Sequence, residues 1–289
     1  MSDTVGNVIN RARGMIGAAL STEMTTLSSP FTQGDPSISV SVERRVAPGS
    51  VLCVGLTTFQ AMAVSGNVIS VVQGADGSPS DDYPAGEPVL IRPSHTTWQA
   101  FEALNNVVAE VSSPVHGLYQ VNEEEFPVDV VDGTYVLPTL PTKILRVRYR
   151  RPGSTDEWDN LPWTYQPGAP LGPTVRTGQA PGGTTVHVQY GVPYRRASRL
   201  SETLDGMSVP IEASGLLATG VARDMSLSLE SRRVQPFTQG DPRRAEEVPS
   251  TGNVVVYDRL NRRFRELVQA ERARLLSQYP YRHQMEQFV

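Results

Sequence analysis

The sequence VPIEASGLLATGVARDMSLSL, at residues 209–229, repeats apolar side chains every four positions, a spacing typical of a helix. The repeating positions are Leu217, Val221, Met225 and Leu229. The other flank is built of small residues, namely Ala213, Gly215, Ala218, Gly220 and Ala222. Because small side chains let another backbone approach closely, we expect a central, buried helix over residues 209–234.

A second long helix is predicted over residues 252–278, with a length of about 40 Å at roughly 1.5 Å per residue. Its apolar stripe consists of Val256, Leu260, Phe264, Leu267 and Leu275. Arginines cover the remaining faces, at positions Arg259, Arg262, Arg263, Arg265, Arg272 and Arg274. The stripe predicts a helix that packs along one side only.

Two further helices are predicted nearer the start of the chain. Residues 4–20 follow the helical period, and Ser2, Asp3 or Thr4 could cap their first turn. Residues 96–111 begin with Thr96 and Gln99, which have the spacing of a capping box. All four helices are expected to share one core.

Short runs with β character, broken by Gly and Pro turns, fill the rest of the chain. Residues 37–93 predict a small barrel or meander, and residues 117–200 predict a sandwich-like module. The expected fold class is α+β: a helical core of about four helices with two inserted antiparallel β modules. The core would comprise residues 1–36, 94–116 and 201–289, the last with an extended tail.

The composition excludes several classes of protein. A chain of 289 residues with 39% hydrophobic and 19% charged residues can bury a substantial interior. Its net charge of −4 argues against general affinity for nucleic acid. The single cysteine, Cys53, lies in an apolar run where a buried thiol is expected, and no run is long enough to span a membrane. We therefore expect a protein made in a reducing cytoplasm.

The heptapeptide PFTQGDP occurs twice, at residues 30–36 and 236–242. Both copies follow a predicted helix, so we expect two equivalent helix exits. A shared turn in which Phe31 and Phe237 fill gaps explains the repeat most simply. Stacking of the two copies, within a subunit or between neighbours, would instead make both phenylalanines interface residues.

Arg146, Arg148 and Arg150 alternate with apolar residues in a predicted strand and therefore share one face. That face could bind a phosphate or a partner carboxylate, or it could simply be exposed to solvent. Nearby, Trp158 and Trp163 could form a sugar-binding platform, although packing across the sandwich is the simpler interpretation.

No catalytic, cofactor-binding or metal-binding motif is present in the sequence. The four histidines are widely separated, and no nucleophile elbow, phosphate loop or dinucleotide fingerprint occurs. Asp76, Asp81 and Asp82 lack the spacing of a calcium loop, and the acidic run 123–125 is expected to be solvated. We expect a protein that is not an enzyme.

The tail after residue 278 is rich in residues that commonly anchor interfaces, namely Tyr279, Tyr281, Arg282 and Phe288. Pro280 prevents the preceding helix from continuing. We expect this segment to insert into a partner rather than to fold back on its own subunit.

The order of predicted elements resembles the head-to-tail adaptor proteins of the tailed-bacteriophage neck. That order is a helix, a β segment, a helix, a second β segment and two long helices. The first β segment contributes the runs PGSVLCVG (residues 48–55), VISVVQGADGS (68–78) and YPAGEPV (83–89).

The resemblance implies a structural virion protein that forms a homo-oligomeric ring, commonly of twelve subunits. Such a ring joins the portal protein to the tail or to a second neck protein. Double-stranded DNA passes through it without sequence-specific binding. Three alternatives stay open: another tail component such as a terminator or baseplate piece, a sugar-binding module, and a hydrolase with scattered acids around Asp81.

Overall fold

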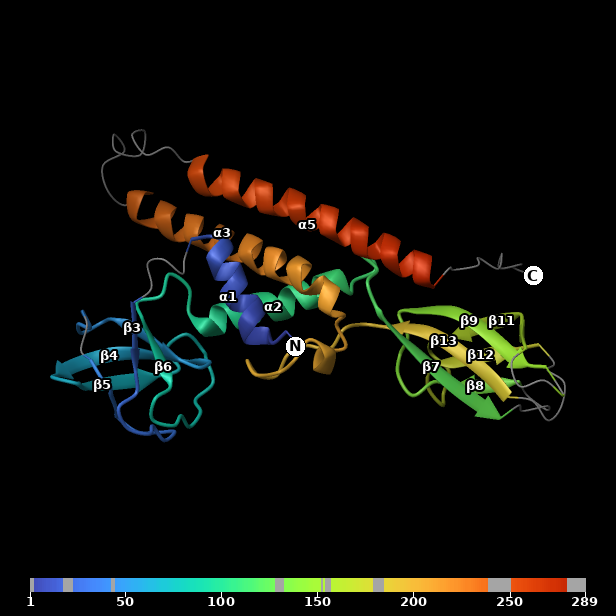
Figure 1. Ribbon diagram of the computed structural model, residues 1–289, viewed down its shortest axis with the longest axis horizontal. Helices are drawn as coiled ribbons and strands as arrows, with labels where there is room; N and C mark the ends of the chain where they lie inside the picture. Colours follow the sequence, from blue (N-terminus) through green and yellow to red (C-terminus); the bar gives the residue numbers. More distant parts are fainter. Residues whose placement is uncertain are drawn as a thin grey trace. The chain divides into compact units, whose positions relative to one another are not determined.

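The computed structural model describes residues 3–17, 23–42, 45–127, 133–151, 153, 157–178, 185–238 and 251–279 (Figure 1). The side chains of residues 228–238 and 251–253 are not described. The chain divides into two compact units. The first comprises Met1–Val108 and Arg196–Leu267, and the second comprises Ala109–Arg195 and Val268–Val289.

The fold is mostly β, which corrects the predicted α+β class with a helical core. Among the described residues, thirteen strands form three sheets and only four α-helices are present. The segments of sequence that follow the helical period are long and are therefore easily recognised. Most strands have only three or four residues, too few to show a clear alternation, so the sequence understates the share of β structure.

The first unit contains a six-stranded antiparallel sheet in the order β1-β6-β3-β4-β5-β2. Its strands are β1 (Glu23–Thr26), β2 (Ser37–Ser39), β3 (Val51–Val54), β4 (Thr57–Ser65), β5 (Val68–Gln73) and β6 (Pro88–Ile91). The sheet curls into a half-barrel, and the chain just beyond its two edge strands pairs through Leu27 and Val40. Leu52, Phe59 and Ile69 are fully buried inside it. Strand β1 lies in the segment that we had assigned to the helical core.

The second unit contains a four-stranded sheet, β10-β9-β13-β7, and a three-stranded sheet, β11-β12-β8. The first is formed by β7 (Gln120–Pro127), β9 (Lys143–Arg150), β10 (Trp158–Asn160) and β13 (Thr185–Val192). The second is formed by β8 (Thr134–Val136), β11 (Trp163–Gln166) and β12 (Thr174–Thr177). Residues of both sheets, such as Val188 and Val175, belong to one buried apolar cluster, as in a sandwich.

The four helices are α1 (Val5–Met15), α2 (Thr97–Val111), α3 (Ser214–Thr238) and α5 (Thr251–Gln278). Each overlaps a predicted helix, and the capping box is confirmed, because Thr96 and Gln99 exchange hydrogen bonds of 3.2 and 3.1 Å. Helix α1 ends earlier than predicted, before Gly17 with its positive φ of 70°. No described helix combines the length and the apolar character needed to cross a bilayer.

Most side chains of α3 between Leu216 and Ser226 are buried, as the small residues of this helix predict. A Cβ atom added at Gly220 would lie 2.6 Å from Val107 of α2 and 2.9 Å from Phe264 of α5. The guanidinium of Arg223 also lies 4.3 Å from the centre of the Phe264 ring. Gly220 therefore permits a close approach of α2 and α5 to α3.

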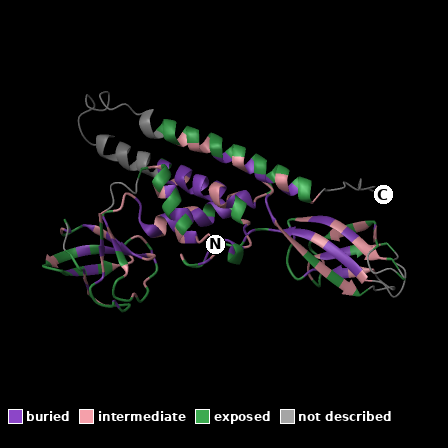
Figure 2. Cartoon of the chain, in the orientation of Figure 1, coloured by how far each residue is buried: buried purple, intermediate pink, exposed green. Residues whose placement is uncertain are grey.

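Helix α5 is mostly exposed along its length (Figure 2). Its buried side chains are Phe264, Val268, Glu271 and Leu275, spaced four, three and four residues apart, so they form one narrow seam. This confirms packing along one side. Leu267, which we had placed in the apolar stripe, is only partly buried, and Val256 is 37% exposed.

Candidate functional site

The three arginines of β9 lie on the face of the four-stranded sheet that points away from the sandwich core. Val147, between them in sequence, is 1% exposed and belongs to the core cluster. Arg146, Arg148 and Arg150 are each partly exposed. The predicted separation of the arginines from the apolar side of β9 is confirmed. The neighbouring strands determine which side chains surround the arginines.

A chain of hydrogen bonds crosses this face from β9 through β13 to β7. The Nε of Arg148 donates to Nδ1 of His187 at 3.3 Å, and Nε2 of His187 lies 3.2 Å from Glu123. Because an arginine can only donate, Nδ1 must accept, and the ring proton on Nε2 is donated to the carboxylate. Gln189 donates to the other Glu123 oxygen at 2.7 Å.

Trp158 of β10 covers the other end of the same face. The guanidinium carbons of Arg148 and Arg150 lie 4.9 and 5.0 Å from its ring centre, and the His187 ring lies 5.4 Å away. Both arginines thus make cation–π contacts with one indole. We call the set Arg146, Arg148, Arg150, Trp158, His187, Gln189 and Glu123 the arginine face.

The contacts of the arginine face bear on the two interpretations of Trp158 and Trp163, which were a sugar-binding platform and packing across the sandwich. Trp163 packs against the sandwich core, as predicted, and Tyr165 packs there as well. Trp158 instead contacts two guanidinium groups and His187, so its ring is already engaged with side chains of its own chain. These contacts support packing of Trp158 within its own chain.

Exposed ion pairs join the residue that follows β9 to β10 and to the residue before it. Arg151 donates to both oxygens of Asp159 at 3.1 Å and to Glu157 at 2.6 Å. The hydrogen bond from Arg151 lowers the pKa of Asp159, and the same bond raises the pKa of Arg151. Since these groups are exposed, they contribute little to stability and act mainly on what approaches the surface.

Sequence reasoning identified the arginines but missed His187, Gln189 and Glu123. Glu123 had been interpreted as part of a solvated acidic run. The alternation of β13 places His187 and Gln189 on one side, which is a detectable signal. Which strand lies next to β9 is a non-local property, however, so the contact with Arg148 could not be predicted.

Two other predicted site residues, Phe31 and Tyr279, lie among the described residues. Phe31 is 2% exposed inside the half-barrel, where its ring lies 5.1 Å from that of Phe59. The first PFTQGDP copy connects β1 to β2, so the predicted helix exit is wrong there. Tyr279 is partly buried just after α5, and its N–H donates to Leu275 at 2.8 Å.

The other predicted anchors cannot be placed. Phe237 lies within α3, in the part whose side chains are not described. Tyr281, Arg282 and Phe288 lie outside the described residues. Their assignment as interface residues stays a prediction.

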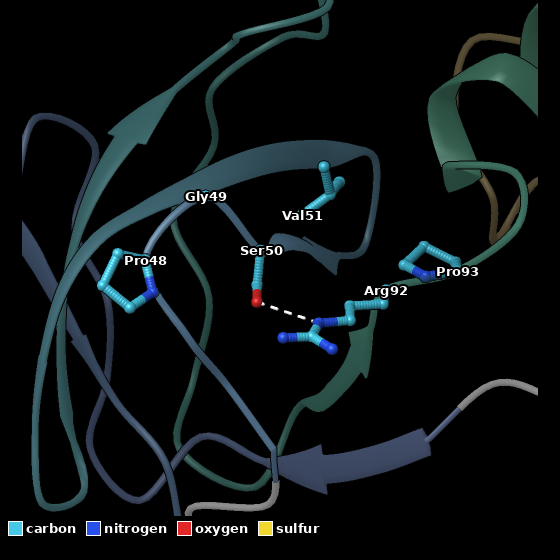
Figure 3. Close-up of a pocket in the computed structure, with 6 residues that line it drawn as sticks. All are labelled: Pro48, Gly49, Ser50, Val51, Arg92 and Pro93. Carbon is cyan, nitrogen blue, oxygen red and sulfur yellow. Dashed lines mark hydrogen bonds between the residues drawn. The ribbon is translucent and has the colours of Figure 1, made fainter. Parts of the chain in front are cut away.

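The first unit contains two pockets that offer alternative sites. One, of about 390 Å³, lies beside β3, where the Nε of Arg92 donates to Ser50 at 3.0 Å (Figure 3). Its described lining has no histidine or carboxylate, and the Ser50 hydroxyl is held by Arg92 and by the Ala47 N–H. Among the described residues that line this pocket, Ser50 has no adjacent base to activate it as a nucleophile.

The second pocket, of about 330 Å³, contains Asp76, Glu102 and Asp224 among its lining residues. The Asp76 carboxylate already accepts hydrogen bonds from Thr58 and Thr96, both at 2.9 Å. No group of three potential metal ligands occurs in the described part of the chain. The hydrolase and calcium interpretations gain no support from this pocket.

Comparison with known proteins gives no relative from which a role could be transferred: no family model matches the sequence, and no curated protein is similar to it.

Proposed function

We propose that this protein is a structural subunit of a bacteriophage neck, where copies form a ring between the portal and the tail. The observation that carries the proposal is the composition of the α5 surface. The order of helices and β segments along the chain agrees with the layout on which the resemblance to neck adaptors rests. The ring would be assembled in the host cytoplasm and leave an axial passage for DNA.

The first turns of α5 expose three consecutive valines. Val254, Val255 and Val256 are 47%, 61% and 37% exposed. Leu227 of α3, in the same unit, is 49% exposed. Consecutive residues point in different directions around a helix, so the three valines present apolar surface on more than one side of α5. Contact with a second copy of the chain would bury them.

The charge of α5 favours the same kind of contact. The helix carries six arginines and three carboxylates, a net charge of +3, whereas the whole chain has a net charge of −4. The rest of the chain therefore has a net charge of −7. A basic helix on one copy and an acidic surface on the next are complementary, and contacts between unlike surfaces generate closed rings.

The arginine face would serve as a second contact surface. Its guanidinium groups match carboxylates of a neighbouring subunit, the portal, or a tail or second neck protein. DNA would pass through the ring without sequence-specific binding, and the negative net charge supports sliding rather than retention.

The proposal is tested by measuring the mass of the purified chain with light scattering and imaging it for ring symmetry. Val255→Glu should reduce the mass, because a charge would be buried between copies. Leu171→Glu, at a residue that is 81% exposed in the second unit, is the matched control and should leave the mass unchanged. A wild-type chain that stays monomeric at every concentration tested would overturn the proposal.

A further inference from the structure

A pocket of about 240 Å³ in the second unit brings together two basic side chains from distant parts of the sequence. Lys143 begins β9, and Arg272 lies on α5. Thr142 and Tyr119 line the pocket beside them, and Leu275 and Leu276 form an apolar wall. None of the described residues that line it is acidic.

The wall formed by Tyr119 depends on a glycine. Gly191 of β13 pairs with Lys143, and a Cβ atom added at Gly191 would lie 2.7 Å from the Tyr119 ring. The absence of a side chain at position 191 therefore lets the ring pack against the strand beside Lys143. Tyr119 is only 5% exposed in this position.

The electrostatics of the pocket are unfavourable for cations. Burial lowers the pKa of Lys143, and the positive charge of Arg272 lowers it further. Burial raises the pKa of Tyr119, so its hydroxyl is neutral at pH 7. The buried Glu271 on the same helix accepts from the Nε of Arg274 at 2.9 Å.

We propose that this pocket binds a small oxyanion, a phosphate or a carboxylate group, between Lys143 and Arg272. An ammonium and a guanidinium form charge-assisted hydrogen bonds to such a group, and an anion relieves the repulsion between the two cations. The Thr142 hydroxyl can donate a further hydrogen bond. Leu275 and Leu276 would contact the apolar part of a larger ligand. The proposal is independent of ring formation.

The sequence provides a direct probe, because Lys143 is the only lysine of the chain. Reductive methylation with ¹³C-formaldehyde keeps its charge and gives one lysine NMR signal, while the labelled α-amino group serves as an internal control. Inorganic phosphate and acetate are titrated separately at constant ionic strength. One or both should shift the lysine signal saturably and raise the pKa of Lys143. The comparison identifies the preferred class of oxyanion.

Variants of Arg272 make the test specific. Arg272→Gln should weaken binding about tenfold, as expected for loss of one charge-assisted hydrogen bond, and should raise the pKa of Lys143 in the absence of anion. Arg272→Lys should restore most of the affinity. Arg265→Gln, the same change at an exposed position of the same helix, should have no effect. Shifts that do not saturate, or that are equal in Arg272→Gln and Arg265→Gln, would overturn the proposal.

Discussion

Asp76 connects the turn after β5 to the start of α2. Its carboxylate accepts hydrogen bonds from the hydroxyls of Thr58 and Thr96 at 2.9 Å and from the Ser78 N–H at 3.2 Å. Partial burial raises the pKa of this carboxyl, but the hydrogen bonds from Thr96, Ser78 and Thr58 lower it more, so the net direction is down. The sequence indicates only that Asp76, with Asp81 and Asp82, lacks the spacing of a calcium loop.

Asp76→Asn should therefore destabilise the first unit by about 2 kcal/mol at pH 7, the order expected for hydrogen bonds to a charged group. A carboxyl with a lowered folded pKa stabilises the fold above its ordinary pKa. That contribution is lost as the pH falls below about 4. The difference between variant and wild type should therefore shrink in acid. Urea unfolding at pH 7 and at pH 3 measures both effects.

Asp81→Asn is the control for this substitution, because Asp81 is exposed and its carboxylate accepts from the Asp82 N–H. It should change the free energy of unfolding by less than about 0.5 kcal/mol. Equal losses in the two variants would contradict a structural role for the Asp76 carboxylate.

The side of a strand or helix on which a single residue lies was predictable where the local period of the sequence determines it. The alternation of β9 was enough to separate Arg148 from Val147. His187 could not be assigned to the arginine face, because its contact with Arg148 spans 39 positions of sequence. The pairing of distant strands depends on the whole sheet, and no local pattern contains it.

Among the elements, α3 gives the sharpest test of packing. Gly220→Ala places a methyl group within 3 Å of Val107 and Phe264, so it should destabilise the first unit by about 1–3 kcal/mol. This loss should occur although alanine is the better helix former. Thermal or urea unfolding followed by circular dichroism provides the measurement.

Gly215→Ala is the matched substitution in the same helix, where a Cβ atom meets no other atom within 4 Å. It should be neutral or stabilising by up to about 1 kcal/mol. If both variants were stabilised, Gly220 would not be a point of close approach between helices.

The four helices have a clear period in the sequence, and each overlaps a predicted helix. Strand β1 was missed because EMTT offers only four residues and one buried side chain, Thr25. It becomes a strand by pairing with β6, more than sixty positions later. Such tertiary pairing decides the state of short segments, and for this reason the predicted fold class was too helical.

At the scale of the whole molecule, the proposed neck ring predicts a role for residues 280–289. Deleting them should abolish binding to the portal, because Tyr281, Arg282 and Phe288 would be removed together. The fold should be retained, since the buried clusters of the half-barrel and the sandwich lie elsewhere. Co-sedimentation with purified portal rings, together with circular dichroism of the deletion variant, checks both expectations.

A scrambled sequence of residues 280–289 is the control for tail length. It should bind no better than the deletion if the anchors act through their positions. Full portal binding by the deletion variant would reject the assignment of these residues, while ring formation through α5 would still be tested separately by Val255→Glu.

Cys53 is the only cysteine of the chain and is 1% exposed on β3. Burial raises the pKa of its thiol, so the folded protein offers a reagent neither access nor thiolate. Modification must therefore wait for the half-barrel to open around β3. The rate at which a thiol-specific dye reacts thus reports how often this region unfolds, in free subunits and in assembled particles alike, without any engineered label.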